Sequence, residues 1–192
     1  MNNQKPKKLI KQLKIIKKYV KIYNIKNRKG INMKTSIIPN KNQINVFDVA
    51  LYIVENNPHP TTKMKLNKMI YYAHAKHLVQ TKKPLVKEQI QAWIYGPVFP
   101  ELCAQLKEFT YKPLNPDSLS MGDATKINAA QKQILDDIIS LYGNKEANFL
   151  SQQTHEEDPW KNTYYINSDW SKNIIKNKDI LEYFSKNTKH IC

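Results

Sequence analysis

His155 and Lys68 are the residues of this 192-residue sequence whose types suit acid–base or nucleophilic chemistry. His155 is followed by Glu156, but adjacent side chains on a turn diverge, so the two do not form a catalytic dyad by themselves. An enzyme would need a buried, pKa-shifted His155 beside Lys68 in a cleft. The pattern favours this interpretation only weakly, and we expect no catalytic residue.

Metal ligands and cofactor motifs are also lacking in the sequence. His74 and His77 have the i, i+3 spacing of one helix face, but no HExxH pattern or nearby carboxylate accompanies them, which favours surface histidines. Cys103 and Cys192 have no CxxC partner, and Cys103 fits a small core residue. The 4 glycines lie too far apart for a phosphate-binding loop. We therefore expect no metal and no cofactor.

Two segments combine polar groups with large aromatic residues. One contains Trp93 and Tyr95 followed by Gly96 and Pro97, and the other is Thr154-His155-Glu156 followed by Pro159-Trp160. Tyrosine and tryptophan offer large contact areas at low entropic cost, which suits a recognition surface. The same residues suit a corner of the core, and on the residues alone we favour core packing.

The elements that position these residues are predicted to be short helices separated by polar breaks. Helices are expected at 45–55, 62–80, 100–109, 128–142, 145–152 and 177–187, a strand or extended loop at 88–98, and a structured loop or single turn at 154–160. The first helix is expected to bury Phe47, Ala50, Leu51 and Val54, and the second Leu66, Met69, Ile70 and Ala73. The sequence predicts a mainly α, single compact domain of about six helices at 44–187, a short β element near Trp93 and a tail at 188–192.

The positive charge is concentrated in a basic leader, residues 1–41. This leader holds twelve lysines, Arg28 and no acid, whereas residues 42–192 hold 18 bases against 16 acids. It is predicted to form an amphipathic helix or a disordered segment, with Lys11, Lys14, Lys18 and Lys21 off the apolar stripe. Those lysines suit nucleic acid, an anionic membrane surface or an acidic partner. Alternatively, translation begins at Met33 and the leader is not made.

No stretch approaches the length of a membrane span, and no signal sequence is recognisable, so we expect a soluble cytoplasmic protein.

An ordered set of motifs resembles a known family. KLNKMIYYAHAKHL (65–78), KPLVKEQIQAWIYGPVFPEL (83–102), Leu141-Tyr142-Gly143 and LSQQTHEEDPW (150–160) resemble the Panacea domain, the SocA-like antitoxin domain also found in phage-associated GepA proteins. The resemblance implies a bacterial antitoxin of a type II-like, two-gene module with a role in phage defence. Such an antitoxin binds its cognate toxin, which is encoded next to it and often inhibits translation. Some relatives instead deliver a toxin to a protease.

The motif match indicates a set of partner-binding or family-motif residues: Lys68, Tyr71, Tyr72, Trp93, Tyr95, Gly96, Pro97, Thr154, His155, Glu156 and Trp160. Glu156, Glu157 and Asp158 are further expected to form an acidic surface that favours a basic toxin. A nucleic-acid-binding regulator that uses only residues 1–41 remains the alternative of another class. The sequence leaves the oligomeric state open.

Overall fold

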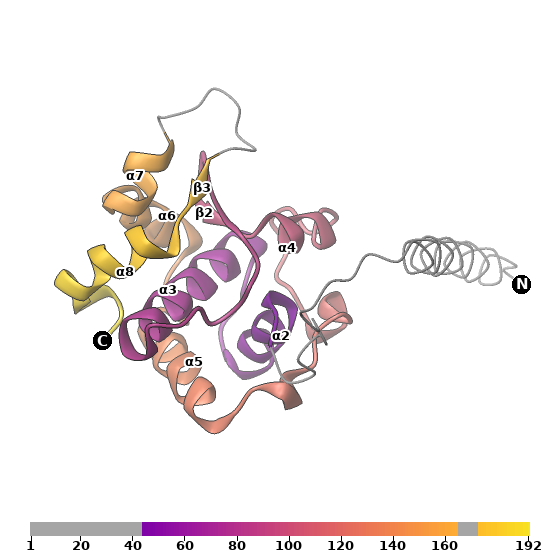
Figure 1. The fold of residues 1–192 in the computed structure, drawn as a ribbon. Helices are drawn as coiled ribbons and strands as arrows, with labels where there is room; N and C mark the ends of the chain where they lie inside the picture. Colours follow the sequence, from indigo (N-terminus) through magenta and orange to yellow (C-terminus); the bar gives the residue numbers. More distant parts are fainter. Residues whose placement is uncertain (1–43, 165–172) are drawn as a thin grey trace, which may run out of the picture. The chain divides into compact units, whose positions relative to one another are not determined.

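The computed structural model describes residues 44–164 and 173–192 (Figure 1). The predicted basic leader, with Lys11, Lys14, Lys18 and Lys21, lies outside the described residues. The described chain forms α2 (Val46–Asn56), α3 (Lys63–Thr81), β1 (Ile90–Trp93), β2 (Gly96–Val98), α4 (Pro100–Gln105), α5 (Ala129–Tyr142), α6 (Ala147–His155), α7 (Asp158–Tyr164), β3 (Ile174–Ile175) and α8 (Asn177–Lys186). Three short 3-10 helices are η1 (Pro116–Leu119), η2 (Ala124–Lys126) and η4 (Thr188–His190). The predicted mainly helical fold is confirmed.

Helix α3 is the centre of the domain. It contacts α2, α5, α6, α8 and β2, and Figure 1 shows it between α2, α5 and α8. Thr62 begins this helix by accepting a hydrogen bond from the backbone N–H of Lys65. Because neighbours surround α3, it buries polar residues as well as the predicted Leu66, Met69, Ile70 and Ala73.

A three-stranded antiparallel sheet in the order β2-β1-β3 lies against α3 and α6 through β2. Strands β1 and β2 form a hairpin in which Trp93 pairs with Gly96 across the turn residues Ile94 and Tyr95. The predicted β element near Trp93 is thus confirmed. Strand β3 was not predicted, because its two residues carry no recognisable pattern of their own.

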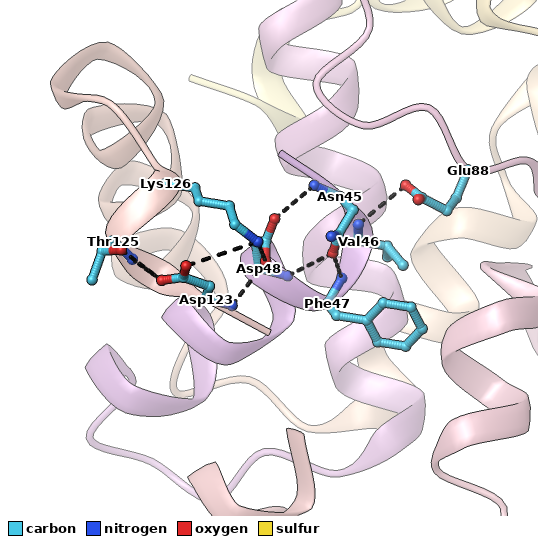
Figure 2. A network of polar contacts seen from close by, with 8 residues as sticks. All are labelled: Asn45, Val46, Phe47, Asp48, Glu88, Asp123, Thr125 and Lys126. Carbon is cyan, nitrogen blue, oxygen red and sulfur yellow. Dashed lines mark hydrogen bonds and ion pairs between the residues drawn. The ribbon is translucent and has the colours of Figure 1, made fainter. Parts of the chain in front are cut away.

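A polar network holds the start of α2 (Figure 2). The side chain of Asn45 accepts hydrogen bonds from the backbone N–H groups of Phe47 and Asp48 and so caps the helix. The buried carboxylate of Asp48 accepts from the N–H of Asn45 and, at 2.8 Å, from the N–H of Asp123, while Lys126 lies 3.3 Å away. Asp48 therefore caps α2 and joins it to η2.

The sequence predicts that α5 buries Ile134, Leu135, Ile138, Ile139 and Leu141, and this prediction, like the one for α2, is wrong in part. Helix α2 buries Val46, Val49, Ala50 and Ile53, whereas the predicted Phe47, Leu51 and Val54 pack only partly against the core. In α5, Tyr142 is buried while Ile139 and Leu141 are partly exposed. Both helices are apolar over more than one stripe, and only tertiary neighbours decide which stripe faces inward.

The predicted loop at 154–160 is also wrong. Helix α6 continues through Thr154 to His155, and α7 begins at Asp158. The Thr154 hydroxyl donates to the carbonyl oxygen of Ser151 within α6 and does not cap a helix. Pro159 fits the first turn of α7, where a backbone N–H has no partner inside the helix.

Candidate partner-binding site

Three of the predicted motif segments meet behind the β1–β2 hairpin. The Nζ of Lys68, on α3, donates a 2.9 Å hydrogen bond to the carbonyl oxygen of Pro97 on β2. Gly96 has φ +100°, and a Cβ there would lie 2.5 Å from the Thr154 hydroxyl oxygen and 2.7 Å from the Cε of Lys68. Only glycine fits such a backbone angle without strain in so small a space. Lys68, Gly96, Pro97 and Thr154 are buried and join α3, β2 and α6.

Burial dominates the electrostatics of Lys68. The side chain is fully buried, and among the described residues no carboxylate forms an ion pair with it. Desolvation lowers the pKa of Lys68 to about 7, and the nearby Cys103 thiol offsets only part of that effect. Cys103 itself is half-buried rather than a full core residue, and burial raises its pKa. Near neutral pH, Lys68 therefore loses much of its charge while its amine can still donate to Pro97.

A second buried network surrounds Glu157. Its Oε1 accepts a 3.0 Å hydrogen bond from the Tyr72 hydroxyl and lies 2.9 Å from Nδ1 of His190. The Gln153 amide donates to the hydroxyls of both Tyr72 and Tyr142, whose rings stack with centroids 4.7 Å apart. Burial raises the pKa of Glu157, and the contacts with His190 and Tyr72 oppose that shift. This network joins α3, α5, α6 and the C-terminal residues.

Tyr71 belongs to the same part of the core. It is fully buried, and its ring lies 5.5 Å from that of Tyr72 and 5.9 Å from that of Phe184. Desolvation raises the pKa of Tyr71, and the charge of Glu157 raises it further. Residues 188–190 form η4, and Ile191 is buried beside it.

An aromatic stack lies between α6 and α7. The ring of His155 stacks on Trp160 at 4.1 Å, Trp160 stacks on Tyr164 at 4.6 Å, and the Trp160 indole donates to the carbonyl oxygen of Trp93 at 2.9 Å. Trp160 is buried, whereas Trp93 and His155 are half-buried. Burial lowers the pKa of His155, and the nearby Lys68 ammonium lowers it further.

An enzyme would need a pKa-shifted His155 close to Lys68 in a substrate cleft. The two residues are close to one another, but the described residues form no cleft at Lys68. Lys68 has no exposed surface. A groove of about 270 Å³ lies between α7 and α8, lined by residues such as Asp158 and Tyr183, and neither His155 nor Lys68 lines it. No cluster of three potential metal ligands occurs among residues 44–164 and 173–192.

The predicted surface position of His74 is wrong. His74 is buried, its Nε2 lies 2.9 Å from the Asn177 side chain, and desolvation lowers its pKa to about 4. His77 is half-buried, with Nδ1 2.8 Å from the carbonyl oxygen of Lys83. His74 faces inward because α3 is enclosed on several sides, which the spacing of residues along one helix cannot reveal.

Few of the predicted partner-binding residues lie on the surface. Tyr95 is 64% exposed at the hairpin turn, next to Ile94 at 53%, and the hydroxyl of Ser151 donates to the carbonyl oxygen of Tyr95 at 3.0 Å. Glu156 is also exposed. The expectation that Glu157 belongs to an acidic surface is wrong, because its side chain is fully buried in the Tyr72–His190 network.

Sequence reasoning missed the roles of Ser151, Glu157 and His190. Each acts through a partner more than 30 positions away, so no local spacing predicts it. The Ser151 side chain lies within the LSQQTHEEDPW motif, which is the one signal that pointed to it.

The fold and site define a small, mainly helical domain in which helical side chains hold a β-hairpin with an exposed apolar turn. Residues 66–161, half of the chain, match the family described as antitoxin SocA-like, Panacea domain, and the chain belongs to that family. The predicted resemblance is therefore confirmed.

A curated relative supports the same family. The chain is 42% identical over 41 residues to antitoxin SocA of Caulobacter vibrioides (strain NA1000 / CB15N). The matched segment covers 21% of this chain and 22% of that protein, so it spans about a fifth of the relative's length. No solved structure shows significant similarity. No helix within the described ranges is both long and apolar enough to cross a membrane.

Proposed function

We propose that this chain is the antitoxin of a type II-like, two-gene module and neutralises its cognate protein toxin by direct binding. The observation that carries the proposal is its membership of the antitoxin SocA-like, Panacea family over residues 66–161. The local match to antitoxin SocA supports it. The proposed partner is encoded by the adjacent gene and inhibits translation in the cytoplasm.

The described domain suits a role in binding. Its motif residues fix the backbone of a hairpin by side-chain hydrogen bonds from α3, α6 and α7. A rigid surface loses little conformational entropy on association, which favours tight binding. Neutralisation then consists of covering the active surface of the toxin, and it needs neither a cofactor nor a chemical step on the antitoxin.

A growth assay tests the antitoxin role. The adjacent gene is expressed alone, with the full chain, and with a form that starts at Met33. We expect the adjacent gene alone to arrest growth and both forms of the chain to restore it. A harmless neighbour, or a toxic neighbour that neither form neutralises, would contradict the proposal.

A translation reaction assembled from purified components, without any protease, distinguishes direct binding from delivery of the toxin to a protease. We expect the purified chain to restore translation when it is equimolar with the toxin. Rescue in cells but not in this reaction would instead assign the chain to the proteolytic adaptors.

The charge of residues 1–41 favours a second candidate, a regulator that binds nucleic acid. Thirteen bases without an acid would neutralise several phosphates, and the affinity would then fall steeply with salt. Binding of duplex DNA by the full chain, absent from a form comprising residues 42–192, would support this candidate. Equal binding by both forms would contradict it.

A further inference from the structure

We propose that the turn residues Ile94 and Tyr95 are the anchor through which the domain enters an apolar pocket of its toxin. This inference rests on the proposed function and names the contact surface. Four observations carry it: the composition of the turn, its exposure, the hydrogen bonds that hold it, and the lack of charge at its tip.

The composition of the turn is not dictated by its backbone. Among the described residues only Lys82 and Gly96 have a positive φ, so Ile94 and Tyr95 hold backbone angles that most residue types adopt. Their side chains nevertheless are large and apolar and remain 53% and 64% exposed. Neither backbone geometry nor core packing therefore requires these two residue types, whereas contact with a partner accounts for them.

The backbone of the turn is held from three helices. The Trp160 indole of α7 donates to the carbonyl oxygen of Trp93 at 2.9 Å, just before the turn. The Ser151 hydroxyl of α6 donates to the carbonyl oxygen of Tyr95 at 3.0 Å. Lys68 of α3 donates to the carbonyl oxygen of Pro97 at 2.9 Å, just after it. The two exposed side chains thus project from a backbone whose position is fixed before any partner arrives.

Such pre-organisation is what a binding anchor requires. Fixing a loop in its bound conformation removes the ordering penalty from association. Tyrosine adds a large contact area with only two rotatable side-chain bonds and is enriched among residues that dominate interface energetics. The hairpin accordingly presents one aliphatic and one aromatic anchor at adjacent positions.

The tip is uncharged, which identifies the kind of surface that it fits. Neither turn residue is a lysine, arginine or carboxylate, and Lys68 behind the hairpin is fully buried. Burial lowers the pKa of His155, whose side chain contacts the Ile94 backbone, and so disfavours its charged form. A site for nucleic acid would need exposed Lys or Arg beside the aromatic ring. We therefore assign the tip to a protein pocket that is apolar inside and offers a hydrogen-bond partner to the phenol at its rim.

Other exposed apolar side chains provide matched controls. Tyr111 is 88% exposed and Phe149 is 47% exposed, and both lie outside the hairpin, Tyr111 after α4 and Phe149 on α6. Replacing either by alanine removes a similar apolar area without changing the tip. Tyr95→Phe retains the ring and removes only the hydroxyl.

The experiment measures the affinity of the purified full chain for the protein that it neutralises in the growth assay, by calorimetric titration. We expect Tyr95→Ala to weaken binding at least about thirtyfold, as loss of a central interface residue does, and Ile94→Ala about tenfold. Tyr95→Phe should stay within about threefold of wild type, and Tyr111→Ala and Phe149→Ala should leave the affinity unchanged. Melting temperatures equal to that of wild type verify folding.

Each other result overturns the inference. Unchanged affinity of the folded Tyr95→Ala and Ile94→Ala variants, with tight binding by wild type, rejects the anchor and leaves the proposed function intact. Equal weakening by Tyr111→Ala rejects a specific role of the tip. If the tip variants alter self-association and not toxin binding, the tip is a contact between copies of this chain. No binding by wild type rejects the proposed function and the inference with it.

Discussion

The Nζ atom of Lys68 donates a hydrogen bond to the carbonyl oxygen of Pro97, 2.9 Å away, within the core of the domain. The bond joins the central helix α3 to strand β2 across 29 positions of sequence. A buried amine without a carboxylate partner is unfavourable when it is charged. The domain therefore fixes its hairpin with a group whose protonation depends on pH near neutrality.

We expect the stability of the chain to rise with pH relative to a Lys68→Met variant. Burial lowers the pKa of folded Lys68 from 10.5 to about 7, so between these values the unfolded state binds more protons than the folded state. Stability then increases with pH, by about 2 kcal/mol between pH 7 and pH 9. Well below pH 7 Lys68 is protonated in both states, and the two curves run parallel.

Urea denaturation of both proteins over this pH range measures the effect. Methionine has a similar volume and no titratable group, so the difference between the two unfolding free energies isolates Lys68. A difference that does not change between pH 7 and pH 9 would show that folded Lys68 keeps its ordinary pKa.

Replacing Gly96 by alanine should destabilise the fold. The residue has φ +100°, and the added methyl group would meet the Thr154 hydroxyl at 2.5 Å and Lys68 Cε at 2.7 Å. Backbone strain and displacement of these packed atoms together should reduce the free energy of unfolding by about 3 kcal/mol. Ile94→Ala, two positions earlier and exposed, should change it by less than about 0.5 kcal/mol. Thermal melting of the two variants compares them directly, and equal melting temperatures would contradict the prediction.

The starts of α2 and α5 were predictable from the sequence because their causes are local. Asn45 with Asp48, and Asn128 with Gln131, satisfy backbone groups within three positions, and the structure has both caps. The end of α5 at Gly143 follows from equally local signals. Motif order also identified the family, since it required only the sequence itself.

The burial of Lys68, His74 and Glu157 was not predictable in this way. Their partners Pro97, Asn177 and His190 lie 29, 103 and 33 positions away. The pattern of polar residues along α3 does not indicate which of them are buried, because a central helix surrounded by others buries lysine and histidine alike. Which of the motif residues are buried, and which are exposed at the hairpin turn, depends on tertiary packing.

Charge reversal at two adjacent glutamates should affect stability to very different extents. Glu156 is exposed, and its 3.8 Å contact with Lys161 is a surface pair of small energetic value. Glu156→Lys should therefore leave the melting temperature nearly unchanged. Glu157→Lys places a cation beside His190 in the core and should reduce the free energy of unfolding by about 4 kcal/mol or more.

The same pair tests whether acidity contributes to recognition. If the folded Glu156→Lys variant binds the toxin less tightly in low salt and equally at high salt, the exposed carboxylate attracts a basic surface. Unchanged binding at low salt would show that the charge of Glu156 does not contribute to partner choice. Circular dichroism verifies that the variants are folded, and a Glu157→Lys variant that matches the stability of wild type in urea denaturation would contradict the buried network.

The contact between His190 and Glu157 should stabilise the C-terminal residues in a pH-dependent manner. His190→Ala removes the imidazole 2.9 Å from Oε1 but keeps the backbone carbonyl that accepts from the Tyr142 hydroxyl. The carboxylate then remains buried with Tyr72 as its hydrogen-bond donor. We therefore expect the free energy of unfolding to fall by about 3 kcal/mol at pH 7.

The loss in His190→Ala should shrink as the pH falls towards 5. Burial raises the pKa of Glu157 and His190 lowers it, so removing His190 raises that pKa further. Between the ordinary value of 4.5 and the raised value, the folded state binds the extra proton, and stability increases as the pH decreases. Glu157→Gln in the same background should abolish this dependence, because an amide does not titrate. His59→Ala, at an exposed position, is the matched control and should behave as wild type. A pH-independent loss would mean that His190 stabilises the core by packing on Tyr72, whose ring centroid is 6.4 Å away, and not through the carboxylate.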